Sequence, residues 1–147
     1  MLDYDFESSI GYWLCTTSHA YQRAMNEELT AQGITFRQCE VLGWLAAEGE
    51  QSQVELAERM RIEPPTLVRV LDRMERDGLV SRSSCPGDRR RKMIKPLAKA
   101  KPIWKKIVAS ANVVRARAVQ GLTKQEAATL KKLLAKVRER LGEEASV

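Results

Sequence analysis

The segment from residue 51 to residue 96 limits the possible folds of this chain more than any other. It reads QSQVELAERMRIEPPTLVRVLDRMERDGLVSRSSCPGDRRRKMIKP, with two short helical patterns before a strand, a turn and a second strand. Ser52 and Glu55 form a capping-box pattern at the start of the first helix. Pro64 and Pro65 suit a first helical turn, where their missing N–H groups would have no intrahelical partner. A helix-turn-helix followed by a hairpin predicts a winged helix-turn-helix.

The remainder of the chain is predicted to be helical. Apolar residues at helical spacing predict long helices over residues 5–30, 97–120 and 124–141, and a shorter one that begins after Thr35 and ends at residues 48–50. The long amphipathic helices have no partner of sufficient size in one chain, so we expect them to pack against a second copy. The predicted fold is therefore mainly α: a winged helix-turn-helix domain with a two-stranded wing (residues 34–97), flanked by dimerisation helices (residues 1–33 and 98–147).

The charges are divided unevenly along the 147 residues, which carry a net charge of +6. Residues 1–50 hold two basic and eight acidic side chains, whereas residues 51–147 hold 23 basic and 11 acidic ones. This division indicates a face for an anionic partner, and charge alone leaves nucleic acid and an anionic membrane open. No apolar run approaches the ~20 residues of a membrane span, and the acidic N-terminus lacks a signal-peptide pattern, so we expect a cytoplasmic protein that does not enter a membrane.

Candidate catalytic and metal-binding residues are missing from the sequence. It has one histidine, no phosphate-binding loop, and three widely spaced cysteines without a CxxC pair, so we predict no enzyme activity and no cofactor. Three reduced thiols are the favoured interpretation of Cys15, Cys39 and Cys85. Cys85 lies among many cations, which favour the thiolate, so a thiol-based redox-sensing regulator remains an alternative.

The helix that begins near Pro64 carries a candidate reading surface. Leu67 and Leu71 are spaced to pack inward, which places Thr66, Arg69 and Arg73 outward. Arginine can bind guanine through two hydrogen bonds, which provide about 1–3 kcal/mol of discrimination. A solvated charged face is the commoner fate of such residues. The helix-turn-helix spacing and the wing favour a role in DNA contact for these residues.

The turn between the two predicted strands carries the strongest signal. Arg89, Arg90, Arg91 and Lys92 place four like charges on consecutive residues, and self-repulsion opposes such a run in folding. A narrow minor groove attracts arginine because its negative potential is enhanced. Asp88 is the single acid here, and we expect it to orient one of the arginines through a charge-assisted hydrogen bond.

Several of these motifs resemble the MarR family of winged-helix regulators, and within it the SlyA-like branch. The motifs are IT…Q…L at residues 34–42, QSQ…LA at 51–57, IEPPTLVRVLD at 62–72, GLVSR at 78–82 and DRRRK at 88–92. Pro96 and Leu97 depart from the family, whose members usually carry Leu-Thr there, with the Thr capping the next helix.

The resemblance implies a homodimer that regulates transcription, as a repressor or counter-silencer, from pseudo-palindromic sites in double-stranded DNA. The helix at Pro64 would enter the major groove, and Arg90 with Arg89 the minor groove. The DNA-binding residues expected from motifs and resemblance together are Ser52, Pro65, Thr66, Arg69, Arg73, Arg82, Asp88, Arg89, Arg90 and Arg91. A non-specific architectural nucleic-acid-binding protein and a protein-interaction module are the competing classes.

Many family members release DNA when a small phenolic or aromatic anion binds, or when a cysteine is oxidised. Tyr12, His19, Tyr21 and Trp44 are the candidates to line such an effector pocket, because they bring aromatic rings and the single histidine to the N-terminal helices. Packing in a dimer interface is the competing interpretation for these residues, and we favour it.

Overall fold

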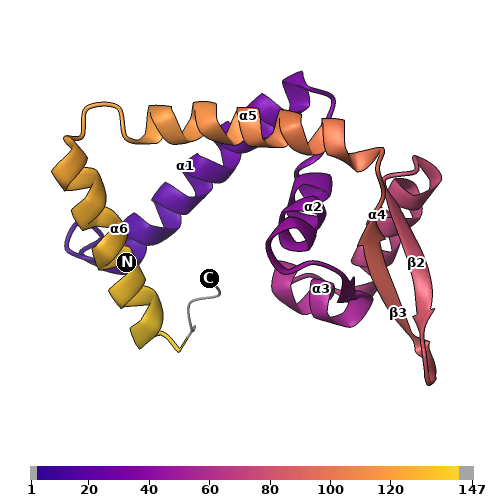
Figure 1. Ribbon diagram of the computed structural model, residues 1–147. Coiled ribbons are helices and arrows are strands. Elements are labelled where there is room, and N and C mark those ends of the chain that lie inside the picture. The colour runs from indigo at the N-terminus through magenta and orange to yellow at the C-terminus, as the bar shows by residue number, and fades with distance from the viewer. Residues whose placement is uncertain (1–2, 143–147) are drawn as a thin grey trace. The chain divides into compact units, whose positions relative to one another are not determined.

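The computed structural model describes residues 3–142, which form six helices and three strands (Figure 1). In chain order they are α1 (Ile10–Ala31), α2 (Phe36–Glu48), β1 (Gln51–Ser52), α3 (Gln53–Met60), α4 (Pro64–Arg76), β2 (Val80–Cys85), β3 (Asp88–Pro96), α5 (Ala100–Ala118) and α6 (Lys124–Arg140). The chain divides into two compact units, residues up to 114 and residues from 115 onward. The predicted fold class is confirmed, with corrections to the wing given below.

Local sequence signals define the helix ends. Capping boxes begin α2, α3 and α6, formed by Thr35 with Gln38, Ser52 with Glu55 and Thr123 with Glu126. In each box the N-cap hydroxyl accepts from the third backbone N–H, and the longer side chain accepts from the N-cap backbone N–H. The first helix starts at Ile10 instead of residue 5, because Ser9 caps it.

The wing belongs to a three-stranded antiparallel sheet of order β1-β3-β2, and not to a two-stranded ribbon as predicted. The two-residue β1 pairs Gln51 with Ile94 and Ser52 with Met93. This strand ties the residues just before α3 to the root of the wing. The hairpin of β2 and β3 projects beyond α3 and α4 (Figure 1).

The cationic run lies on a strand and not in the turn that was predicted. The turn proper is Pro86 and Gly87, and β3 begins at Asp88. Asp88 pairs with Cys85, and Lys92 pairs with Ser84. Since these two β2 partners are consecutive, the three arginines between Asp88 and Lys92 lie in an irregularity of the ladder without partners on β2. Such irregularities redirect side chains out of the regular sheet pattern.

The core of the first unit lies between the helix-turn-helix and the sheet. Its fully buried apolar side chains come from α1, α2, α3, α4, α5 and the roots of β2 and β3: Leu29, Val41, Leu56, Leu67, Leu71, Met74, Val80, Ile94 and Val114. The predicted inward packing of α4 is therefore confirmed at Leu67 and Leu71, and Met74 on the same helix is buried as well. Their burial fixes which face of α4 points away from the core.

Some apolar side chains remain exposed. In the second unit, α6 buries no residue, and Leu130, Leu133 and Leu134 are exposed. In the first unit, Ile10 and Trp13 of α1 are exposed as well.

Candidate nucleic-acid interface

The outward face of α4 carries polar and cationic side chains. Pro65, Thr66, Arg69 and Arg73 are exposed. Leu67, Leu71 and Met74, which alternate with them, are 0% exposed. The buried stripe holds the helix on the core, so the opposite face is available to a partner.

The amino end of α4 differs from an ordinary helix start. Pro64 and Pro65 lack a backbone N–H, and those of Thr66 and Leu67 donate to the Glu63 carbonyl oxygen at 2.9 and 3.3 Å. An ordinary helix start offers free N–H groups that bind phosphate. Here the side chains must supply any contact to an anion.

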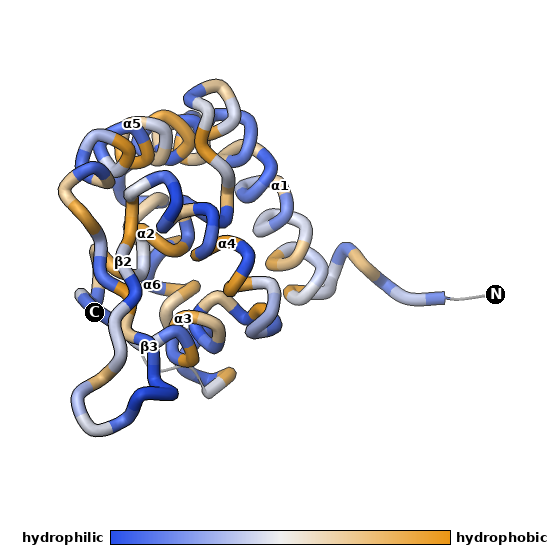
Figure 2. The backbone as a smooth tube through the Cα atoms, turned by 90° about the vertical axis from the view of Figure 1, so that its right-hand side faces the viewer, coloured by the Kyte–Doolittle hydropathy of each residue, from blue (hydrophilic) through white to orange (hydrophobic). Residues whose placement is uncertain are grey.

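The wing tip carries the exposed guanidinium groups. Arg89 and Arg90 are exposed, and within residues 3–142 neither side chain has an ion-pair partner. The β3 side of the tip is strongly hydrophilic (Figure 2). Asp88 accepts a hydrogen bond from the backbone N–H of Arg90 at 2.9 Å. The predicted orienting role therefore acts on the Arg90 backbone, and no guanidinium is the donor.

Arg82, predicted to contact DNA, is bound to two carboxylates of α4. Its Nε and Nη2 donate to Glu75 Oε2 at 3.0 and 2.7 Å, its backbone N–H donates to Glu75 Oε1 at 3.1 Å, and Nη2 also pairs with Asp72. The hydrogen bonds from Arg82 lower the pKa of Glu75. The guanidinium thus links β2 to α4 and is not available as a free cation.

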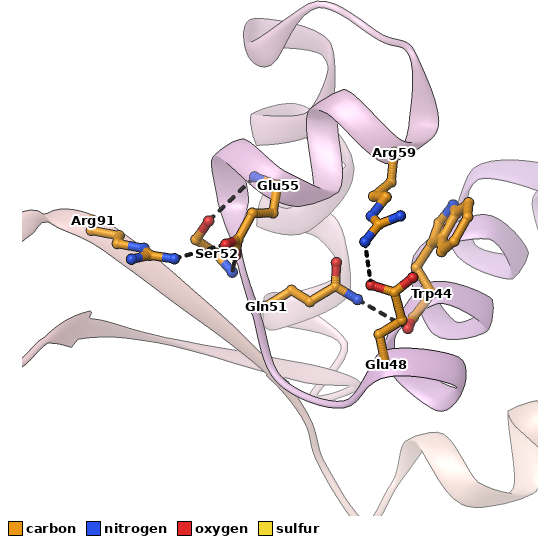
Figure 3. A network of polar contacts seen from close by, with 7 residues as sticks. All are labelled: Trp44, Glu48, Gln51, Ser52, Glu55, Arg59 and Arg91. Carbon is orange, nitrogen blue, oxygen red and sulfur yellow. Dashed lines mark hydrogen bonds and ion pairs between the residues drawn. The ribbon is translucent and has the colours of Figure 1, made fainter. Parts of the chain in front are cut away.

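Ser52 and Arg91 also bind within the protein (Figure 3). Ser52 is 2% exposed, and its hydroxyl accepts from the Glu55 backbone N–H at 3.2 Å. Its side chain therefore caps α3 and does not face a partner. Arg91 Nη2 binds Glu55 Oε1 at 2.8 Å. Hydrogen bonds from Ser52, followed by the charge of Arg91, lower the pKa of Glu55.

The four predicted effector residues lie on two helices, with Tyr12, His19 and Tyr21 on α1 and Trp44 on α2. Trp44 lies under the Arg59 guanidinium at 5.5 Å, and Arg59 also pairs with Glu48 at 2.8 Å (Figure 3). Tyr12 packs its ring against Phe6 and Trp13 at the exposed start of α1. His19 and Tyr21 are exposed on the same helix.

A hollow of about 390 Å³ lies elsewhere in the first unit, between α2 and the start of α5. Its lining residues are Leu42, Leu45, Ala46, Pro96, Leu97, Ala98, Ala100, Lys101 and Trp104. The lining is mainly apolar, with one cation at Lys101. None of the four predicted effector residues lines it, and sequence reasoning missed it. The one local signal was the departure at Pro96 and Leu97, which now form part of its wall.

The cysteines lie apart and unpaired. Cys15 is exposed, whereas Cys39 and Cys85 are half-buried, and all three are free thiols. Burial raises the pKa of the Cys39 thiol, and the charge of Glu40 raises it further. Cys39 is therefore disfavoured as a thiolate.

A helix with a free polar face beside an arginine-bearing wing defines a winged helix-turn-helix protein of the DNA-binding class. The model of the MarR family matches residues 34–92 of this chain. The match covers the helix-turn-helix and the wing as far as Lys92.

Solved structures show the same fold over most of the chain. Wild-type MarR from E. coli without ligand is 28% identical, with a TM-score of 0.80 over 88% of this chain and 96% of that chain. A mutant E. coli MarR complexed with operator DNA is 28% identical, with a TM-score of 0.75 over 87% of this chain and 92% of that chain. NadR in complex with 4-hydroxyphenylacetate is 26% identical, with a TM-score of 0.74 over 93% of this chain and 97% of that chain. Within residues 3–142 no helix has the length and apolarity to cross a bilayer.

Proposed function

We propose that this protein is a cytoplasmic transcriptional regulator that binds operator DNA with α4 in the major groove and the wing tip in the minor groove. The observation that carries the proposal is the free face of α4 beside the unpaired arginines of the wing. Arg69 and Arg73 are the base-reading candidates, and Thr66 contacts a phosphate or a thymine methyl. Arg90, with Arg89, inserts into the narrow minor groove. The motif set favours the SlyA-like branch, and a role as repressor or counter-silencer.

The regulator acts as a homodimer on a pseudo-palindromic site. The exposed leucines of α6 and the exposed Ile10 and Trp13 of α1 support this, because apolar stripes of this kind are usually covered by a partner. Two copies related by a twofold axis place two recognition helices about one DNA turn apart. Sedimentation at micromolar concentration tests the dimer, and a monomer would contradict it.

Selection of binding sites from random DNA tests the proposed function. A regulator enriches a twofold-symmetric sequence and binds it about a thousandfold or more tighter than random DNA. The Arg69→Ala variant is expected to relax the choice of base at one position. The Arg90→Ala variant is expected to weaken binding to all sites with the same flanking minor groove. Equal loss on every sequence for Arg69→Ala would remove its base-reading role.

The rival functions predict different results. A non-specific architectural protein gives a similar salt dependence but little preference for any sequence. A protein-interaction module keeps its function in Arg90→Ala. A thiol-based sensor loses DNA binding on oxidation and retains it when Cys85 and Cys15 are replaced by serine.

The hollow beside Lys101 is the site we propose for an effector, a small aromatic acid. Its apolar wall suits a ring, and the Lys101 ammonium suits a carboxylate. The structural relative NadR binds 4-hydroxyphenylacetate, which makes this compound a first probe. Titration with 4-hydroxyphenylacetate should quench the fluorescence of Trp104 and lower the affinity for DNA. Both effects should be lost in Lys101→Gln. The matched control is Lys105→Gln on the same helix, outside the wall. Equal loss in both variants would contradict the site.

A further inference from the structure

We propose that Arg91 is a positioning residue that clamps the wing to α3 through Glu55, and does not itself bind DNA. The inference rests on the proposed DNA-binding function and changes the role of one residue in the arginine run. From the sequence, Arg91 was grouped with Arg89 and Arg90 as a DNA contact. The structure gives its guanidinium a protein partner.

Glu55 divides its two oxygens between two elements. Oε2 accepts from the Ser52 backbone N–H at 2.8 Å, which completes the capping box of α3. Oε1 accepts from Arg91 Nη2 at 2.8 Å (Figure 3). One carboxylate therefore joins the start of the helix-turn-helix to the wing strand.

The clamp lies where the sheet stops constraining β3. The short β1 ladder ends at Met93, which pairs with Ser52. Beyond Lys92 toward the tip, the three arginines have no partner on β2. The contact of Arg91 with Glu55 is thus the next tie between β3 and the helical body. It holds the base of the tip that carries Arg89 and Arg90.

The other wing strand has a matching tie. Arg82 of β2 binds Asp72 and Glu75 of α4. The two strands are therefore each joined to a different helix of the helix-turn-helix by an arginine and a carboxylate. This arrangement sets the direction of the wing relative to the recognition helix before DNA binds, which lowers the cost of ordering the wing in the complex.

A variant exists that removes the clamp and keeps the helix cap. Gln38 performs in α2 the capping role that Glu55 performs in α3, so Glu55→Gln retains the capping bond and loses the charge that binds Arg91. The matched control is Glu126→Gln, since Glu126 occupies the same position in the capping box of α6. The pKa of Glu126 is lowered by hydrogen bonds from Thr123, with no arginine among its causes.

DNA affinity is measured for Glu55→Gln, Arg91→Ala and the double variant on the selected operator. Each single variant should bind about 2- to 5-fold more weakly, as expected for the loss of a half-exposed ion pair. The double variant should bind no more weakly than the singles, because both changes remove one interaction. The slope of log affinity against log salt should remain unchanged in Arg91→Ala and fall by about one in Arg90→Ala. Glu126→Gln should match the wild type.

A stronger binding of DNA by Glu55→Gln, instead of a weaker one, would overturn the clamp. Removal of the Glu55 charge next to DNA strengthens binding if Arg91 is a phosphate contact that Glu55 restrains. In that case Glu55→Gln raises the affinity, and Arg91→Ala lowers the salt slope by about one. Additive losses in the double variant would overturn the clamp as well.

A measurement without DNA separates this proposal from the proposed function. Hydrogen exchange of the Arg90–Lys92 amides should be faster in Glu55→Gln than in the wild type and in Glu126→Gln. Unchanged exchange overturns the clamp even if the protein binds its operator. Faster exchange in a protein without sequence preference supports the clamp and rejects the regulator.

Discussion

Replacement of Arg82 by alanine distinguishes a structural role of this side chain, in joining β2 to α4, from a role in contacting DNA. The side chain of Arg82 is 21% exposed, and those of its partners Glu75 and Asp72 are 39% and 55% exposed. Each exposed or half-exposed ion pair contributes about 0.2–1 kcal/mol. Two such pairs, with the packing of the arginine stem, predict a loss of about 1–2 kcal/mol in the free energy of unfolding.

Thermal and urea unfolding at a fixed protein concentration measure this loss. A destabilisation of this size corresponds to about 2–8 °C in Tm. The control is Arg76→Ala, because Arg76 is an exposed arginine on α4, the helix that carries Asp72 and Glu75. Its unfolding should differ from the wild type by less than about 0.5 kcal/mol.

The pH dependence gives a second measurement of the same tie. The pKa of Glu75 is lowered in the folded protein, so the carboxylate stabilises the fold fully above its unfolded pKa. That contribution is lost as the pH falls through the lower folded pKa. The difference in the free energy of unfolding between the wild type and Arg82→Ala should therefore have its full size at pH 7 and shrink below about pH 4.5.

One combination of results would refute the reasoning. If Arg82→Ala unfolds like the wild type but lowers the salt slope of DNA binding by about one, Arg82 contacts phosphate and the tie to α4 is unimportant. If it is destabilised and its salt slope is unchanged, the structural role holds.

Three further substitutions test individual features of the fold. Arg61 has φ of 50° in the left-handed region, so Arg61→Gly should stabilise the protein by up to about 1 kcal/mol in urea unfolding, and a clear loss would show that its side chain is required. Ser52→Ala and Thr123→Ala should each lower the free energy of unfolding by about 1 kcal/mol, because each hydroxyl caps a helix. An unchanged urea midpoint in either variant would contradict the capping role of that hydroxyl. Leu71→Ala should cost about 2–5 kcal/mol in thermal unfolding, and a cost below 1 kcal/mol would conflict with its complete burial.

The elements that sequence predicted are those specified by neighbouring residues. The capping box of Ser52 and Glu55, the paired prolines at the start of α4 and the spacing of Leu67 and Leu71 are signals within a few positions. Each fixes a helix end or a buried face without reference to the remainder of the chain. The free face of α4 followed from the same spacing.

The features that sequence missed connect distant residues. Arg91 and Glu55 are 36 positions apart, and nothing in the run of cations distinguishes the bound arginine from the free ones. Similarly, Arg82 matched a motif associated with DNA, but its partners are set by the packing of β2 on α4. The wall of the hollow combines α2 with the start of α5. Such contacts depend on tertiary structure, which motifs alone do not specify.

The short strand β1 determines the order in which the wing can form. The hairpin of β2 and β3 closes through neighbouring residues, whereas β1 joins Gln51 to Ile94 across the whole helix-turn-helix. Loop closure over such a distance is costly until the intervening helices have collapsed, so this pairing belongs to the late stage of folding. During synthesis the residues of α4 leave the ribosome before those of β3. The wing therefore gains its final orientation only after Pro96 has emerged.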